Sequence, residues 1–288
     1  MKYIYNLLKP FAPILGKCNK LILSLRYRKA LGRKINQKNP VSFYDKIFWL
    51  SCNSDTTMWS KLADKYGVRE FVAQKIGEEY LPKLYGVYDS AKDVDFNILP
   101  NQFVIKTNNG CASNFLIKNK NITDLEKIRK ELKYWLEFPY GELTGQKHYT
   151  KIKPRIIAEE FMYQKDNPQA SLIDYKFFCF NGVPMYCQVM CEREFNTHIF
   201  KMNVYDMQWE PQVHFFKNTL NIKEIDKPSK FEEMKKIAKI LSEGFKFVRV
   251  DLYEINGKVK FGEMTFMPGL NKAWSDETQI MFGKLINL

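Results

Sequence analysis

The residues best placed to do chemistry together lie near the end of the 288-residue chain. Asp251 and Glu263 stand in two apolar runs, 245–254 and 258–265, joined by Asn256-Gly257. An Asn-Gly pair between such runs predicts a two-residue hairpin, which puts the two carboxylates on neighbouring antiparallel strands. A buried carboxylate is costly unless it is paired or binds a cation. The pattern is therefore compatible with an oxygen site for Mg²⁺, which can hold a nucleotide phosphate.

Arg249 lies two residues before Asp251, so both side chains are expected on one face of the strand. A guanidinium there can stabilise negative charge on a group that is being transferred. The alternative is a metal-free salt bridge among Arg249, Asp251 and Glu263. Spacing alone favours that salt bridge, and both interpretations stay open at this point.

A second candidate group follows the apolar run 102–106. Lys106 ends this run and precedes the small, polar segment 107–113, an arrangement that can aim a lysine at phosphate oxygens while backbone amides cover them. Glu159-Glu160 at the end of a predicted strand and Asp174 with Lys176 are further candidates. All three features also have a simpler explanation: Lys106 can be a solvated lysine, Glu159-Glu160 a surface pair, and Asp174 with Lys176 an ordinary ion pair on one strand face.

These groups need strands and helices to position them. Short helices are predicted over 41–80, including a helical face in 57–76, and strands over 80–87, 102–106, 114–118 and 155–162. Further strands are predicted over 174–180, 183–192 and 198–206, with a hairpin turn at Asn181-Gly182. Capping boxes at Thr123/Glu126 and Ser229/Glu232 predict helices over about 124–138 and 230–243.

Taken in order, the motifs resemble the ATP-grasp superfamily of carboxylate–amine ligases, and most closely its TupA-like family, which is frequent in bacterial cell-surface polysaccharide clusters. The matching segments are QFVIKTNNG, AEEFM, DYKFFCFNG, VRVDLYEINGK and FGEMTFMPG. The resemblance covers roughly residues 40–285. It implies an α+β, ATP-grasp fold in which two α/β lobes clasp ATP, preceded by a helical basic N-terminal arm. The domains implied are the arm (1–40), an N-terminal α/β subdomain (41–99), a small lobe (100–162) and a large lobe (163–288).

The resemblance also implies roles for individual residues. Lys106 and the loop residues Asn108, Asn109, Gly110 and Ser113 would meet the nucleotide phosphates. A hinge of Glu159, Glu160, Phe161 and Met162 would meet adenine, and Asp174 and Lys176 would lie at the ribose and phosphates. Arg249, with Lys176, would act on the transferred phosphate, and Asp251, Glu263 and Thr265 would hold Mg²⁺. Thr265 stands where the superfamily often has Asn, and Gly110 is the single glycine of the loop.

The implied reaction is ATP-dependent amide formation through an acyl phosphate, with ATP and Mg²⁺ as cofactors. The expected partners are a carboxylate-bearing sugar, such as a uronic acid of a bacterial capsular or other surface polysaccharide, and an amino acid or small amine. The alternative is a glycosyltransferase of the same pathway, which would bind a metal and a sugar nucleotide through a D-x-D pair. Asp93-Val-Asp95 has this spacing but lies in a loop-like stretch and not at a strand end.

The formal charge of +13 invites a nucleic-acid interpretation, but its distribution argues against one. Residues 1–40 hold ten basic residues and no acidic ones, and the remaining 35 basic and 32 acidic residues leave +3. The arm mixes these cations with apolar residues at helical spacing, which fits either a membrane surface or packing on its own domain. We expect a cytoplasmic protein with peripheral contact at the inner membrane face as an open alternative.

Several other classes lack support in the sequence. No apolar run is long enough to span a bilayer, and no secretory signal is expected. Six cysteines without a C-x-x-C pair and three scattered histidines argue against disulfide staples and a zinc site. The G-x-S-x-G elbow of serine hydrolases is absent from the sequence.

Overall fold

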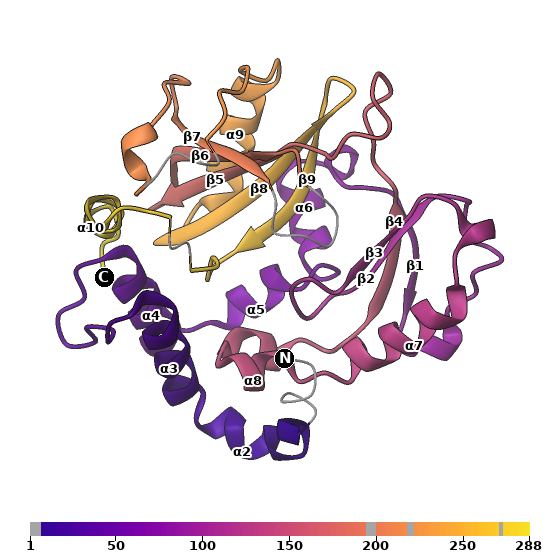
Figure 1. Cartoon of the computed structure of the whole chain (residues 1–288), viewed down its shortest axis with the longest axis horizontal. Helices are drawn as coiled ribbons and strands as arrows, with labels where there is room; N and C mark the ends of the chain where they lie inside the picture. Colours follow the sequence, from indigo (N-terminus) through magenta and orange to yellow (C-terminus); the bar gives the residue numbers. More distant parts are fainter. Residues whose placement is uncertain (1–6, 194–199, 218–221, 271–272) are drawn as a thin grey trace. The chain divides into compact units, whose positions relative to one another are not determined.

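The computed structural model describes residues 7–193, 200–217, 222–270 and 273–288 (Figure 1). Its contacts divide the chain into two compact units. Unit 1 comprises 1–26, 55–71 and 82–162, and unit 2 comprises 27–54, 72–81 and 163–288. The domain boundaries proposed above stay a prediction. All six cysteines are free.

Unit 1 is built around a four-stranded antiparallel sheet with the order β1-β4-β2-β3. Its strands confirm the four strands expected between 80 and 162, shifted by a few residues at their ends. They are β1 (Leu84–Tyr88), β2 (Phe103–Thr107), β3 (Asn114–Ile117) and β4 (Ile156–Glu160). β1 is hydrogen-bonded to β4, so a strand before residue 99 belongs to the same sheet as the strands after it.

The two faces of this sheet differ sharply in chemistry. One face carries Phe103, Ile105 and Ala158, which pack against Ile128 and Leu132 of helix α7 (Leu125–Leu136). Side chains alternate along a strand. Lys106, which follows Ile105, and Glu159, which follows Ala158, therefore point to the opposite face. The sheet thus separates an apolar core from a face that carries charge.

Short helices complete unit 1. The helix predicted over 57–76 is two helices, because residues 64–67 leave helical geometry between them. The elements are η1 (Lys9–Phe11), α2 (Ala12–Lys17), α3 (Asn19–Leu31), α5 (Thr57–Ala63), α6 (Val68–Ile76), η3 (Ala91–Asp93), η4 (Lys120–Ile122), α8 (Tyr140–Thr144) and η5 (Lys147–Lys151), with α3 and α6 continuing into unit 2.

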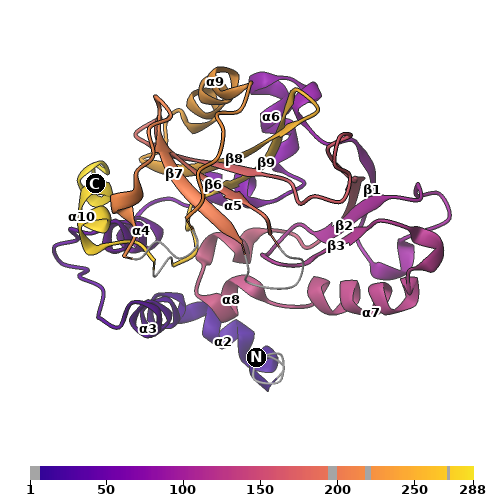
Figure 2. The same ribbon diagram turned by 45° about the horizontal axis from the view of Figure 1, so that its top comes forward.

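Unit 2 contains a five-stranded antiparallel sheet with the order β7-β6-β5-β8-β9, which Figure 2 shows from a tilted direction. The strands are β5 (Asp174–Phe180), β6 (Val183–Cys191), β7 (Lys201–Asp206), β8 (Phe247–Ile255) and β9 (Lys258–Thr265). Helix α9 (Phe231–Ser242) buries Phe231, Ile237 and Leu241, and Phe231 stacks on Phe177 of β5. The remaining helices are α4 (Phe43–Asn53), η2 (Glu78–Tyr80), η6 (Val213–Phe215) and α10 (Asp276–Lys284).

Both predicted Asn-Gly turns are confirmed. Asn181 and Gly182 have φ of 50° and 78°, and Asn256 and Gly257 have φ of 50° and 74°. Positive φ at both central residues is what the two-residue hairpin turn requires, and it explains why Asn and Gly stand there.

The predicted capping boxes are wrong, although both helices that they predicted are present. Helix α7 is capped by Asp124, whose side chain accepts from the Lys127 amide, in place of Thr123. Ser229 does not cap α9, because its hydroxyl donates to Glu254 at 2.5 Å. A capping box does occur at Ser42 and Asp45, at the start of α4.

Among the residues that the structure describes, no helix combines the length and the apolar character needed to cross a bilayer. The N-terminal helices instead bury a few residues and expose many. Leu23 and Tyr27 are 3% and 4% exposed, whereas Leu7, Ile14 and Leu21 are 74%, 64% and 60% exposed.

His148 makes the stability of the fold depend on pH. Its side chain is buried beside Trp59 in unit 1, and burial lowers its pKa to about 3. The unfolded chain takes up a proton near pH 6.5 and the folded chain does not, so stability is complete above that pH and falls below it. We expect a loss of about 2 kcal/mol between pH 8 and pH 5 from this group.

The measurement is urea denaturation at several pH values. His148→Leu should flatten the slope between pH 6.5 and 5, and His214→Leu, at an exposed histidine, should retain it. Identical slopes in the two variants would contradict this assignment.

Candidate active site

Unit 2 carries a cluster of charged side chains on one face of its sheet. In the register of the strands, Lys176 lies opposite Asp251, Asp251 opposite Glu263, and Arg249 opposite Thr265. Directly opposed residues of an antiparallel pair share a face, so three neighbouring strands present these groups together. We call Asp174, Lys176, Arg249, Asp251, Glu263 and Thr265 the ion cluster.

A β-bulge in β9 is necessary for this alignment. Leu252 lies opposite Phe261, but Asp251 lies opposite Glu263, so Gly262 is the extra residue. In a regular ladder without the bulge, Gly262 would lie opposite Asp251, and Glu263 would lie opposite Val250 and point to the other face. A Cβ on Gly262 would come within 2.9 Å of the Tyr253 ring and 3.0 Å of the Asp251 carbonyl, which explains the absence of a side chain there.

Asp251 is the centre of the cluster and is 1% exposed. Arg249 donates to both carboxylate oxygens, Nε at 2.6 Å and Nη2 at 2.7 Å, and Lys176 Nζ donates at 2.7 Å. Burial by itself raises the pKa of Asp251, but the two cations outweigh burial and hold that pKa below its ordinary value. Asp251 is therefore ionised at neutral pH.

Glu263 and Thr265 form the more open side of the cluster. Glu263 Oε1 accepts from Arg249 Nη2 at 3.1 Å and from the Thr265 hydroxyl at 3.0 Å. The Glu263 side chain is 41% exposed, in contrast to 2% for Asp251. Arg249 is thus ion-paired with both Asp251 and Glu263, which is compatible with either of the two interpretations that spacing leaves open.

The donor set also fits Mg²⁺. Asp251, Glu263 and Thr265 offer two carboxylates and a hydroxyl, which are hard oxygen donors, and Mg²⁺ commonly binds one or two carboxylates together with substrate phosphates. In the described part of the chain, no group of three or more His, Cys, Asp or Glu side chains is arranged to hold a metal. Two carboxylates and a hydroxyl would therefore need phosphate oxygens to complete a site.

Arg193, which the sequence analysis did not single out, joins the cluster by pairing with Asp174 at 2.9 Å. Lys176 also lies 3.4 Å from Asp174. Three cations, Lys176, Arg193 and Arg249, thereby face three carboxylates, and the formal charges cancel. A bare divalent cation would add uncompensated positive charge to this neutral group, whereas a cation bound to a phosphate chain would bring its own counter-charge.

Unit 1 carries a second charged group on the face opposite its core. Lys106 pairs with Glu159, and Arg69 donates to the other oxygen of Glu159 at 2.8 Å. Glu159 is buried, while Lys106 is 20% exposed at its side chain. Arg69 has no signal in the sequence, because its partner is 90 residues away. Two cations and one carboxylate leave a net positive charge on this face.

The loop after Lys106 is anchored at its base. Thr107 and Ser113 are joined by their hydroxyls at 2.7 Å and by a backbone bond at 3.0 Å. Asn108 is fully buried; its amide donates to Asp64 at 2.7 Å and accepts from the Arg155 backbone at 2.7 Å. These bonds occupy the Asn108 side chain and fix where the loop begins.

The tip of the loop has the opposite character. In the described part of the chain, no backbone N–H of residues 109 to 112 donates to another residue. Lys65 donates to the Gly110 carbonyl, and Ala112 has φ of 56°. A loop with free N–H groups and a nearby lysine is suited to hold an anion.

The predicted hinge lies at the end of β4. The Glu160 amide donates to the Lys83 carbonyl at 2.9 Å, and its carboxylate accepts from the Lys83 amide at 3.2 Å. Phe161 and Met162 follow the strand and are half-buried. The Glu160 amide is therefore already used, and a ligand at this edge would depend on the backbone beyond it.

A comparison with protein-family models matches residues 45–287 to the model described as TupA-like ATPgrasp. The fold with its two antiparallel sheets is accordingly the ATP-grasp fold, the class of ATP-dependent ligases that the sequence resemblance implied. Within this class the chain belongs to the TupA-like ATP-grasp family. A search of curated protein sequences found no match.

Solved structures of ATP-grasp ligases are also similar. The ligase PsnB with a minimal precursor shares 9% identity and a TM-score of 0.43, over 84% of this chain and 67% of that one. D-alanine–D-alanine ligase from Bacillus anthracis with ATP shares 14% and 0.44, over 78% and 63%. The macrocyclase MdnC from Microcystis aeruginosa, bound to the precursor peptide MdnA, shares 12% and 0.37, over 92% and 69%. The chain thus spans about two thirds of the length of these proteins.

The ion cluster predicts a clear difference between its two carboxylates. Asp251→Asn leaves Arg249 and Lys176 buried without their shared counter-charge, and we expect a loss of about 3–5 kcal/mol in unfolding free energy. Glu263→Gln, at a partly exposed side chain, should cost less than about 1 kcal/mol. Urea denaturation followed by circular dichroism measures both. Equal costs would show that Asp251 does not hold the sheet together.

Proposed function

We propose that the chain uses ATP to activate a carboxylate for attack by an amine. The observation that carries the proposal is the ion cluster, in which Arg249, Asp251, Glu263 and Thr265 share one sheet face in a chain of the TupA-like ATP-grasp family. The charged face of unit 1, with Lys106 and the open tip of its loop, supports phosphate binding by a second, separate group.

In the proposed reaction a carboxylate oxygen attacks the γ-phosphorus of ATP, ADP leaves, and an acyl phosphate forms. An amine nitrogen then attacks the acyl carbon, loses a proton, and displaces phosphate to give an amide. The protein contributes position and charge neutralisation. Lys106 and residues 109–113 would hold phosphate oxygens, and Arg249 and Lys176 would stabilise the negative charge of the transferred group.

Mg²⁺, held by Asp251, Glu263 and Thr265, would supply charge neutralisation at the phosphates. For its oxygens to become available, Asp251 must share its two cations with the incoming phosphates. The zero formal charge of the cluster therefore favours binding of Mg²⁺ together with the nucleotide. Asp174 and Lys176 would lie toward the ribose and phosphates, and the hinge residues Glu159 to Met162 toward adenine.

For the carboxylate we propose a uronic acid of a bacterial capsular or other surface polysaccharide, with an amino acid or small amine as the second substrate. The family resemblance motivates this choice. The test is ADP release from ATP·Mg with glucuronate or galacturonate and a panel of amino acids. A glycosyltransferase would instead release UDP from a UDP-sugar, and no contact among the described residues favours that alternative.

Nucleotide binding is tested by thermal denaturation with ATP, Mg²⁺ and both. We expect stabilisation of about 2.7 kcal/mol when ATP·Mg is present at 100 times its dissociation constant, and none with Mg²⁺ alone. Lys106→Ala and Glu263→Ala should each abolish most of the ATP·Mg shift. Lys258→Ala, at an exposed lysine beside the Asn256-Gly257 turn, is the matched control. Unchanged shifts in the first two variants would overturn the site assignment.

We also propose that the N-terminal helices contact an anionic membrane surface. Leu7, Phe11 and Ile14 expose 74%, 55% and 64% of their surface, and Leu21 and Leu25 of α3 expose 60% and 55%. Residues 1–40 contain no acidic side chain that would repel anionic lipid. Peripheral membrane binding usually combines two effects: exposed apolar residues are buried in the bilayer interface, and anionic lipid headgroups are attracted to lysine side chains.

Leu23 and Tyr27 are buried, so deletion of the arm would also remove part of the core. Point variants of exposed residues therefore test the proposed membrane contact better than deletion does. The triple variant of Phe11, Ile14 and Leu21 to Ser should bind vesicles containing phosphatidylglycerol at least tenfold more weakly, with unchanged unfolding. The double variant Ile98→Ser and Ile122→Ser, at residues 70% and 84% exposed elsewhere in unit 1, should bind as the unmodified chain does. Equal binding by both variants would exclude the membrane role.

A further inference from the structure

Glu159 is a buried carboxylate of unit 1 that two cations share. It is 4% exposed, and its two oxygens have different partners. Arg69 Nη1 donates to Oε1 at 2.8 Å, and the Lys106 ammonium pairs with Oε2. A buried carboxylate that loses its counter-charge is strongly destabilised. Either cation can therefore leave Glu159 only while the other one stays.

Arg69 is held in place by a second contact. Its Nη2 donates to the Pro82 carbonyl at 2.8 Å, so the planar guanidinium bridges Glu159 and the backbone that precedes β1. The Arg69 side chain is 15% exposed. Its two hydrogen bonds fix the orientation of one rigid group, and a rotation away from Glu159 would break both. Arg69 is thus the fixed partner of the carboxylate.

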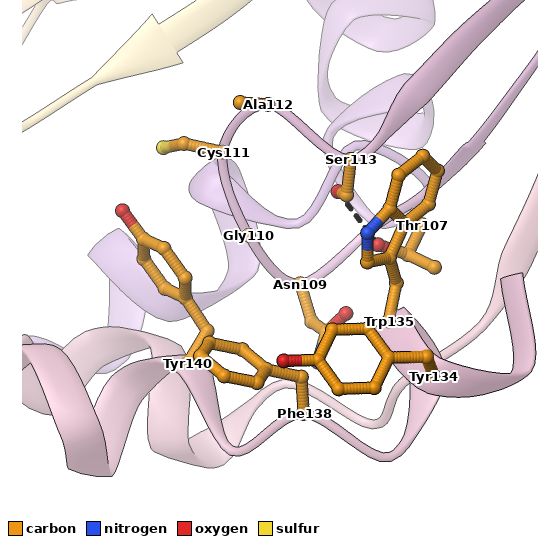
Figure 3. Close-up of a pocket in the computed structure, with 10 residues that line it drawn as sticks. All are labelled: Thr107, Asn109, Gly110, Cys111, Ala112, Ser113, Tyr134, Trp135, Phe138 and Tyr140. Atoms are coloured by element: carbon orange, nitrogen blue, oxygen red, sulfur yellow. Dashed lines mark hydrogen bonds between the residues drawn. The ribbon is translucent and has the colours of Figure 1, made fainter. Parts of the chain in front are cut away.

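Lys106 is the cation that can exchange partners. Among the described residues, Glu159 is the one acidic side chain that pairs with it, and the Lys106 side chain is 20% exposed. The strand that carries it is anchored, because the neighbouring Thr107 is hydrogen-bonded to Ser113 at 2.7 Å, as Figure 3 shows. A change of partner therefore needs only rotation of the four-carbon side chain, whose ammonium has no planar geometry to satisfy.

We propose that Arg69 is a positioning residue of the charged face of unit 1: it neutralises Glu159, so that the Lys106 ammonium can move from the carboxylate to the phosphate oxygens of the nucleotide. Without Arg69, the ammonium would be the sole counter-charge of a buried carboxylate and would stay with it. The inference rests on the proposed function for the nucleotide, and in it Arg69 acts through Lys106.

Binding of ATP·Mg to the full chain, measured by isothermal titration calorimetry, tests the proposal. Arg69→Met removes the charge and keeps a long side chain, so the dissociation constant should rise about tenfold. Arg69→Lys keeps the charge, and its dissociation constant should stay within about threefold of the unmodified chain. The matched control is Arg129→Met, because Arg129 also donates to backbone carbonyls of unit 1, those of Ala91 and Val94. Equal binding by Arg69→Met and Arg129→Met would overturn the proposal.

A second substitution distinguishes charge from packing. In the double variant Arg69→Met and Glu159→Gln, the amide has no charge to hold the Lys106 ammonium, so ATP·Mg binding should return to within about threefold of the unmodified chain. A packing role of Arg69 would leave the double variant as weak as Arg69→Met. Because the double variant buries no unpaired carboxylate, it decides the question even if Arg69→Met does not fold. A dissociation constant raised about tenfold in the double variant would overturn the proposal.

A measurement without nucleotide separates this inference from the proposed function. Acetic anhydride labelling followed by peptide mass spectrometry reports how well the ion pair protects the Lys106 amine, with the exposed Lys258 as internal reference. Labelling of Lys106 should fall about threefold in Arg69→Met and recover in the double variant. Unchanged labelling would overturn the inference.

The two proposals fail in different ways. The expected labelling pattern without any ATP·Mg binding by the unmodified chain would refute the proposed function, and with it the transfer to phosphate, while the sharing of Glu159 by two cations would stand. Normal ATP·Mg binding by the unmodified chain, with equally tight binding by Arg69→Met, would refute the role of Arg69 alone.

Discussion

The structure of unit 2 depends on the neutralisation of one buried carboxylate. Asp251 is 1% exposed, and a charge so enclosed is tolerated only with close counter-charges. Arg249 on its own strand and Lys176 on the neighbouring strand meet this requirement at 2.6 to 2.7 Å. Because the three residues come from β5 and β8, the ion pairs also fix the register between these strands. The same interactions that stabilise the sheet therefore hold the charged side chains in the places where the proposed chemistry needs them.

The sequence predicted the hairpin of β8 and β9 well but could not predict its final alignment. The turn follows from Asn256 and Gly257, because positive φ at both positions is a local property of these residues. Counting back from that turn places Asp251 opposite Gly262, and only the bulge at Gly262 brings Glu263 into line. The bulge depends on close approach to Tyr253 and to the Asp251 backbone, which is a tertiary contact. Proximity of the two carboxylates was thus predictable, and their common face was not.

The partners of the site residues show the same limit. The positions of Lys106 at a strand end and of Asp174 two residues before Lys176 are visible in the sequence. The roles of Arg69 and Arg193 are not, because these residues pair with Glu159 and Asp174, which are distant in the chain.

Helix caps were mispredicted because several side chains near a helix start compete for the same hydrogen bonds. Asp124 caps α7 where Thr123 was expected, and Ser229 bonds to Glu254 and leaves α9 without a side-chain cap. Periodicity located both helices correctly because it sums over many residues, whereas a cap depends on one hydrogen bond.

The charge of the chain is divided unevenly between the N-terminal arm and the two charged groups of the sheets. Most of the excess of +13 lies in residues 1–40, outside both charged groups that we assign to the nucleotide. The ion cluster is formally neutral, and the set of Lys106, Arg69 and Glu159 is only slightly positive. ATP with its metal still carries negative charge, so modest positive charge suffices to bind it, and a strongly cationic site would hold ADP too tightly for release. The lysines of the arm can therefore act on location while the nucleotide groups stay balanced.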